Sequence, residues 1–299
     1  MFKNILIYRI ADGWKPTLKD IEEGLARVRF VSCGASQDKS FGWDSPRGEK
    51  HGALVESVAG QWMLRLKMET KILPTSVVNR RAEERADQIE ESSGRKLGRM
   101  QRKELRENAL LELLPKAFTK ISSLAVWISP EQQLIVIDAG SQNVADEVVS
   151  LLINCLDDLA MVPLQTKMAP ASTMAAWLMS FDVPGQFDLD RECELKATDE
   201  TQATVRYARH NIVIDEVRKH IQNGKMPKQL GLTWAGRISF VLNDALQIKK
   251  IKFLEGVIEK NESQDEGEDH FEADTAIVTG ELSKMIPDLI EALGGELEN

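Results

Sequence analysis

Hydrophobic and polar residues alternate along this chain with two different periods, and together they predict a mixture of strands and helices. A period of two, which places every second side chain on one sheet face, runs through residues 230–234 and 237–242. A period of three to four, which gathers apolar side chains on one helix face, runs through residues 17–28. The predicted fold class is therefore α+β, with mixed antiparallel sheets and helices.

The same two periods, with Gly and Pro as breaks, divide most of the chain into elements. Strands are predicted at residues 3–9, 53–58, 61–68, 121–128, 133–138, 191–196, 204–207, 230–234, 237–242 and 246–254. Helices are predicted at residues 17–28, 76–91, 98–114, 144–156, 173–180, 214–223 and 281–293. Two stretches are predicted to be loops: residues 30–52, which are rich in Gly, Ser and Asp, and the acidic residues 259–269.

The pattern becomes charged and helical after Pro74 and stays so as far as Pro115. We interpret residues 74–118 as a protruding helical arm, because no strand pattern interrupts them. Residues 1–73 and 119–165 on either side of the arm form a central α+β domain in this interpretation. Residues 166–299 form a C-terminal α+β domain.

The net charge of −9 argues at first against a nucleic-acid partner, but the charge is unevenly distributed. Residues 255–299 hold 14 acidic and only 2 basic residues, so the remainder of the chain has a small positive excess. Residues 61–125 hold 14 basic and 9 acidic residues, and residues 196–254 hold 11 and 5. Because local potential attracts phosphate, a basic DNA-facing surface is compatible with an acidic protein. From composition alone, solvated surface charge balanced by Glu is the favoured alternative.

One basic pattern has helical spacing. Arg95, Arg99, Arg102 and Arg106 follow one another at intervals of four, three and four residues, which would place them on one face of a helix. A stripe of this kind suits a phosphate backbone. The alternative is a solubilising face whose cations pair with nearby Glu residues.

Motifs for catalysis are missing from the sequence. It contains no phosphate-binding G-x-x-x-x-G-K-[ST] loop, no G-x-G-x-x-G, no G-x-S-x-G and no H-E-x-x-H. The four His residues are scattered, so no metal site, cofactor or catalytic residue is predicted. Asp138, at the end of a predicted strand, lacks a convincing partner acid and is interpreted as a turn or cap residue.

Two further features bear on where the protein acts. Cys33, Cys155 and Cys193 are widely spaced and odd in number, which favours reduced structural thiols over disulfides or zinc. No apolar run approaches the ~18 residues of a membrane span, and the N-terminus lacks a signal-peptide core. We therefore expect a cytoplasmic protein.

Several strings, spread over nearly the whole chain, resemble the recombination-associated RdgC family. They are FKNILIYR at residues 2–9, KILP at 71–74, LLPKAF at 113–118, FEAD at 271–274, TGEL at 279–282 and LIEALGGE at 289–296. None of these strings is a catalytic motif. Their order and spacing carry the resemblance.

The resemblance implies a homodimer that closes into a ring with a positively charged hole, binds single- and double-stranded DNA with little sequence preference, and limits RecA-mediated recombination at the nucleoid. It also implies an apolar dimer contact at Phe118. A DNA-contacting finger is implied over residues 204–212, with Arg206, Arg209 and His210 as its contacts. Arg209 and His210 stand where the family typically has Lys and Gln.

Two other functions are compatible with the sequence. One is a metal-dependent DNA-processing nuclease that uses acids such as Asp138 and Asp274. The other is a protein that inhibits the recombinase by direct contact.

Overall fold

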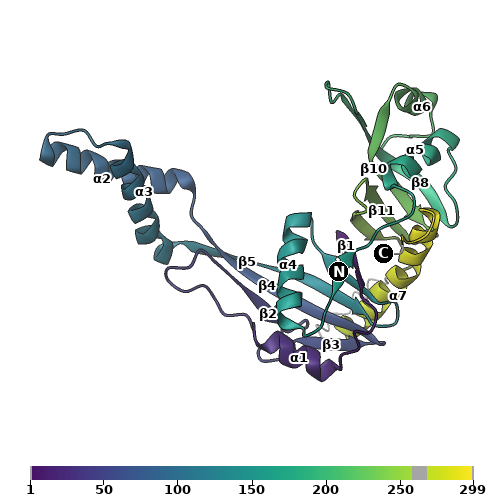
Figure 1. Ribbon diagram of the computed structural model, residues 1–299, viewed down its shortest axis with the longest axis horizontal. Helices are drawn as coiled ribbons and strands as arrows, with labels where there is room; N and C mark the ends of the chain where they lie inside the picture. Colours follow the sequence, from purple (N-terminus) through teal and green to yellow (C-terminus); the bar gives the residue numbers. More distant parts are fainter. Residues whose placement is uncertain (1, 258–267, 298–299) are drawn as a thin grey trace.

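A computed structural model of the chain, described for residues 2–257 and 268–297, confirms the α+β fold class (Figure 1). The strands form one sheet in the order β2-β4-β5-β6-β1-β12-β11-β10-β8-β9, with β3 beside β4 and β7 beside β1. Every strand pair within it is antiparallel. The two halves of the sheet meet where β1 pairs with β12, at Ile5 and Ile248.

The strands are β1 Ile5–Ile10, β2 Lys39–Asp44, β3 Val55–Val58, β4 Gln61–Ile72, β5 Phe118–Ser129, β6 Leu134–Asp138, β7 Met161–Pro163, β8 Phe187–Ala197, β9 Thr204–Ala208, β10 Lys225–Trp234, β11 Ile238–Asn243 and β12 Ile248–Phe253. The helices are α1 Leu18–Ala26, α2 Thr75–Ser93, α3 Arg99–Leu113, α4 Gln142–Cys155, α5 Pro170–Ser180, α6 Asp215–Gln222 and α7 Glu268–Ala292, with a short 3-10 turn at Leu114–Lys116.

The first strand, β1, lies near the middle of the sheet and is buried on both faces. Ile5 and Ile7 belong to a core cluster on one face, and Leu6 and Tyr8 belong to a second cluster on the other. Residues of α7 contribute to the first cluster, and residues of α1 and α4 to the second. This double burial explains why the strand reads as an almost continuous apolar run.

Strands β8 to β12 are covered differently. Leu230, Leu232 and Trp234 on β10 point into the first cluster together with residues of α5, α6 and α7. In Figure 1 these three helices lie on one side of β8, β10 and β11, and no helix among the described residues covers the other side. One face of this half of the sheet is consequently open to solvent.

Strands β4 and β5, with β2 beside β4 as far as Thr70, lead to the helix pair α2–α3 at the far end of the molecule (Figure 1). The helix pair has a small core of its own, formed by Val78, Ala82 and Ala109 with Leu105 packed against them. The two helices are therefore held mainly to each other.

Most predicted elements are confirmed, with shifts of a few residues at their ends. The loop prediction for residues 30–52 is wrong in part, because these residues include strand β2. Its Trp43 is fully buried, and its Gly42 lies against the backbone of Phe30. Gly, Ser and Lys in this strand conceal the alternation. Strand β7 was not predicted at all.

The predicted start of the last helix at Glu281 is also wrong, because α7 already begins at Glu268. Gly280 resembles a break in the sequence, yet the helix passes through it because Val278 and Leu282 on either side are buried in the core. The predicted acidic loop at residues 259–269 lies mostly outside the described residues.

The three cysteines are free thiols, as predicted. Burial raises the pKa of Cys193 to about 12, which suits a structural role. Across the described residues, no helix is both long and apolar enough to cross a membrane.

Candidate nucleic-acid interface

Five basic side chains surround a hollow of about 410 Å³ on the open face of the sheet. We call this feature the basic cup, and define it by Arg191 on β8, Arg206 and Arg209 on and after β9, and Lys250 and Lys252 on β12. Two of the three predicted finger residues, Arg206 and Arg209, therefore lie beside three cations that sequence reasoning did not single out.

Strand alternation places two of these cations, Arg206 and Lys252, on the open face. Tyr207 on β9 packs against the covered core, so its neighbour Arg206 points to the opposite face. On β12, Ile248 and Ile251 are buried in the same core, and Lys252 follows on the open face. The apolar residues that anchor each strand thereby direct the basic ones outward.

Lys250 reaches the cup through a local irregularity. It has a left-handed backbone conformation with φ of 53°, and the pairing of β11 with β12 shifts register between Ser239 and Val241. An irregularity of this kind re-aims a side chain at a cost in backbone strain. The Asn4 side chain accepts a hydrogen bond from the Lys250 backbone at 3.2 Å and so holds the bend.

The floor of the cup depends on Gly231 of β10. A Cβ atom at this position would lie 3.1 Å from the carbonyl oxygen of Glu192 and 3.4 Å from its Cβ atom. Such distances are tighter than ordinary contacts, so a side chain here would push β8 away. Because Gly231 has no side chain, strand β8, which carries Glu192, can lie close to β10 at this point.

Two acids, Asp190 and Glu192, also line the cup, and Glu192 is the one that pairs with its cations. Its Oε1 atom accepts hydrogen bonds from Lys250 and from Arg206, the latter at 3.2 Å. Burial raises the pKa of the Glu192 carboxyl, but these two hydrogen bonds outweigh it and hold the pKa below its ordinary value. Glu192 is thus ionised near neutral pH. Among the described residues, Arg191, Arg209 and Lys252 have no ion-pair partner.

The end of the predicted finger has a strained backbone. Arg209 follows the last residue of β9 and has φ of 56°, which is uncommon for a residue with a side chain. His210 comes next, with its Nδ1 atom 2.7 Å from the Asn211 carbonyl oxygen and its ring beside Tyr207. His210 does not line the hollow. The structure therefore brings Arg206 and Arg209 together in the lining of the cup and leaves His210 outside that lining.

The predicted arginine stripe on the helix pair is only partly correct. Arg99, Arg102 and Arg106 lie on α3, but Arg95 precedes the helix. Gly94, in a left-handed conformation, ends α2 just before it. Arg102 donates to Glu90 of α2 at 2.7 Å, so one cation of the stripe is already paired. Arg102 and Arg106 line a shallow groove between the helices.

Phe118 begins β5 and is one of the most exposed apolar residues, at 84%. Its cross-strand partner Ile72 is 51% exposed. Strand β6 pairs only with residues 126–129 of β5, so within the described residues no strand covers that side of residues 118–125. Exposed apolar side chains and an open strand edge occur together here.

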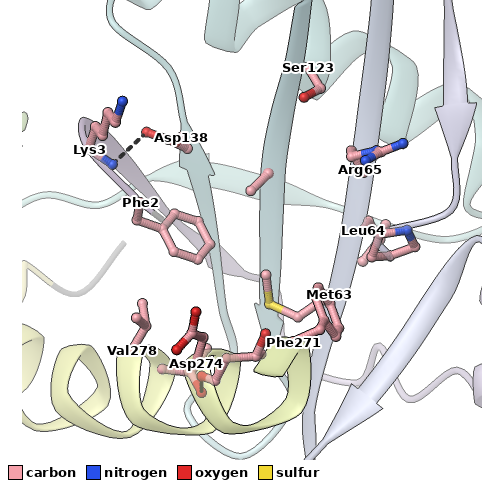
Figure 2. A pocket seen from close by; sticks show the side chains of 14 residues that line it. Phe2, Lys3, Met63, Leu64, Arg65, Ser123, Asp138, Phe271, Asp274 and Val278 are labelled. Atoms are coloured by element: carbon pink, nitrogen blue, oxygen red, sulfur yellow. Dashed lines mark hydrogen bonds between the residues drawn. The ribbon is translucent and has the colours of Figure 1, made fainter. Parts of the chain in front are cut away.

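A second, larger hollow of about 680 Å³ lies between α7 and the sheet. Figure 2 shows its mixed apolar and polar lining, with the Phe2 ring and Met63 near its centre and the Asp274 side chain of α7 beside them. Asp138 lines the same hollow, but its Oδ1 atom accepts the backbone N–H groups of Lys3 and Asn4. The interpretation of Asp138 as a cap residue is confirmed.

The two acids named for a nuclease therefore share one hollow, but one of them already caps backbone groups. Among residues 2–257 and 268–297, no group of three His, Cys, Asp or Glu side chains is arranged to hold a metal ion. This hollow is consequently a poorer candidate site than the basic cup.

Three cup residues, Arg191, Lys250 and Lys252, were missed by sequence reasoning. For Lys250 and Lys252 the available signal was the excess of basic residues in 196–254, together with three lysines in the predicted strand 246–254, whereas Arg191 lies outside both segments. Which of them share a face could not be deduced, because the irregularity at Lys250 breaks the simple alternation.

Fold and surface together define an α+β protein with a cluster of five basic side chains on one open sheet face. The family model described as "Putative exonuclease, RdgC" matches residues 1–296. The chain therefore belongs to the RdgC family.

Similar proteins from three bacteria all have the name recombination-associated protein RdgC. The protein of Dechloromonas aromatica (strain RCB) is 45% identical over 300 residues, which cover 99% of this chain and 98% of the relative. Those of Herminiimonas arsenicoxydans and Bordetella pertussis (strain Tohama I) are 42% and 40% identical over 296 residues, with the same coverage. Recombination is thus the process with which the relatives are associated.

Proposed function

We propose that this chain binds single- and double-stranded DNA without sequence preference and does so through the basic cup. The observation that carries this proposal is the convergence of five Arg and Lys side chains from three strands on an open sheet face. Lys and Arg bind DNA by displacing counterions from phosphates, and that interaction is independent of sequence. The cup presents no recognition helix to a groove, so base readout is not part of the proposal.

The proposal includes a dimer that closes around DNA. The exposed Phe118 and Ile72 at the open edge of β5 support it, because aromatic and aliphatic anchors of this kind favour subunit contacts. The helix pair α2–α3 acts as the protruding arm beside this contact. Encirclement would slow dissociation without any stronger contact to the bases.

A dimer that encircles DNA limits the access of a RecA-type recombinase to the same DNA. The names of the relatives support a role in recombination. A protein with this role acts in the cytoplasm at the nucleoid. No chemistry on DNA is needed, so we propose a binding protein and not an enzyme.

A salt titration of DNA affinity tests the binding proposal. If each subunit neutralises ~3 phosphates, a dimer neutralises ~6, and log K for duplex should fall against log salt with a slope near −5. Several unrelated duplex sequences should give the same affinity. A flat salt response, or a strong dependence on sequence, would contradict the proposal.

Two further assays separate the alternatives. Binding to linear and closed circular duplex, together with solution mass with and without DNA, tests encirclement: a closed ring retains circular DNA through a salt wash that releases linear DNA. Incubation of labelled DNA with Mg²⁺ or Mn²⁺ tests the nuclease alternative, which the shared hollow of Asp138 and Asp274 would explain. Inhibition of the recombinase that persists at rising DNA concentration would favour direct protein contact.

A further inference from the structure

Glu192 lies where a cationic DNA site would be expected to hold no acid. Its side chain is 22% exposed, whereas the two cations bound to it are more exposed, Arg206 at 55% and Lys250 at 48%. The carboxylate is therefore deep in the cup, and the two cations stand around it. An acid in this position opposes a phosphate that approaches the same cations.

The surroundings of Glu192 are built to accommodate it. Gly231 leaves room for the strand that carries it, and its register partner on β9 is the small residue Ala208. Lys250 meets it only because of the bend in β12. Four strands, β8, β9, β10 and β12, thus contribute to one carboxylate site.

We propose that the Glu192 carboxylate is a built-in competitor of the DNA phosphate, which occupies Arg206 and Lys250 in the free protein and is displaced when DNA binds. A carboxylate and a phosphodiester both offer two oxygens to Arg and Lys donors, so one replaces the other at the same pair of cations. The free cup keeps three cations that have no ion-pair partner within the part of the chain that the structure describes, Arg191, Arg209 and Lys252, to make the first contact with DNA.

The consequence is a limit on affinity. A nonspecific DNA-binding protein whose cations are all free to bind phosphate would release DNA slowly. A competing carboxylate within the site reduces the lifetime of each contact between a cation and a phosphate. This inference rests on the proposed function, since the phosphate it concerns is that of DNA.

The test compares Glu192→Gln with wild type in fluorescence anisotropy with a short random-sequence duplex. Removal of the competitor should tighten binding by about 3- to 10-fold at low salt, the range expected for two partly exposed ion pairs. The salt slope should steepen by about 0.9 for each additional phosphate neutralised.

A matched control is Glu194→Gln. Glu194 lies two residues along the same strand, on the same face, and is the register partner of Arg206, but it makes no ion pair within the described residues. Its substitution removes the same charge and should change affinity much less. An equal gain from both variants would show a general charge effect and overturn the inference.

The decisive arm places Glu192→Gln in an Arg206→Gln, Lys250→Gln background. If the carboxylate competes for these two cations, its removal should give no gain once they are neutral, and the coupling between the sites is measured directly. A gain that persists in this background, or no gain in wild type, overturns the inference while the proposed function stands. Wild-type protein that does not bind DNA in a salt-dependent manner would overturn both.

Discussion

Phe118 and Ile72 are direct partners across β5 and β4 at the end of the sheet nearest the helix pair, and both side chains are exposed to solvent. Cross-strand apolar pairs stabilise a sheet by packing against each other, and burial of their outer surface needs a covering element. Within the described residues nothing covers this pair, so the surface suits the subunit contact that we propose.

Substitution of Phe118 by Ser should weaken the dimer by about 2 kcal/mol or more, because it removes an aromatic anchor from the contact. Each subunit should stay folded, since the side chain has no core to leave. Sedimentation would show a shift toward monomer. Met100→Ser serves as the control, because Met100 is 76% exposed on α3 and lies outside this pair. A Phe118→Ser protein that sediments wholly as a dimer, with unaltered retention of circular DNA, would refute the contact.

The cations of α3 give a second prediction. The combined change Arg99→Glu and Arg106→Glu should weaken duplex binding by about fivefold or more if the arm contacts phosphates. The melting temperature should hardly change, since both side chains are exposed. Arg102→Glu differs, because it places a second carboxylate beside Glu90 and should destabilise the helix pair. Unchanged affinity in the folded double variant would show that these cations are solvated surface charge.

Gly42 gives a prediction about stability. A Cβ atom there would lie 2.6 Å from the Phe30 Cα atom and 2.8 Å from the Val28 carbonyl oxygen. Gly42→Ala should therefore displace the backbone of Val28 and Phe30, which is hydrogen-bonded to the backbone of Trp43. This displacement should lower the free energy of unfolding by roughly 2 kcal/mol. Gly140→Ala is the control, because a Cβ atom there meets nothing within 4 Å. Equal denaturation midpoints for the two variants would be inconsistent with the close approach at Gly42.

Asp44 gives a prediction about pH. Burial raises the pKa of its carboxyl, but hydrogen bonds from Arg65 at 2.8 Å and Lys67 at 3.1 Å outweigh it, so the pKa lies below its ordinary value. A lowered pKa stabilises the folded state above the pKa of the unfolded chain, ~3.9, and this contribution is lost as pH falls through the folded-state pKa.

Asp44→Asn should therefore lower the melting temperature near pH 7, and the difference from wild type should shrink below about pH 4. Asp12→Asn, at an exposed position, is the comparison and should show little difference at either pH. A difference between wild type and Asp44→Asn that grows as the pH is lowered would contradict the assigned sign.

Sequence reasoning recovered the elements whose apolar residues have a clear period, such as β10 and β11, because burial on one face imposes that period. It missed β2, whose Trp43 is buried in the second core cluster with residues of α1 and α4, and the first half of α7, where Val278 and Leu282 on either side of Gly280 are buried. Both errors have one cause: tertiary packing overrides local preference.

The candidate site was recovered only in part. Arg206 and Arg209 were identified through the family resemblance, whereas Lys250 and Lys252 join them only because β12 lies in the same half of the sheet as β9. The order of strands in a sheet is not encoded in any local window of sequence. The ion pairs of Glu192 with Arg206 and Lys250 could not be predicted from the sequence for the same reason.

The most direct test of the basic cup is the salt dependence of duplex affinity for the variant Lys250→Gln, Lys252→Gln, measured beside wild type. Both lysines line the cup from β12, and neither side chain is part of the core. The slope of log K against log salt should become shallower by about 0.9 for each phosphate that the variant no longer neutralises, and affinity should fall equally for unrelated sequences. A folded variant that keeps the wild-type slope and affinity would contradict the claim that this sheet face binds DNA.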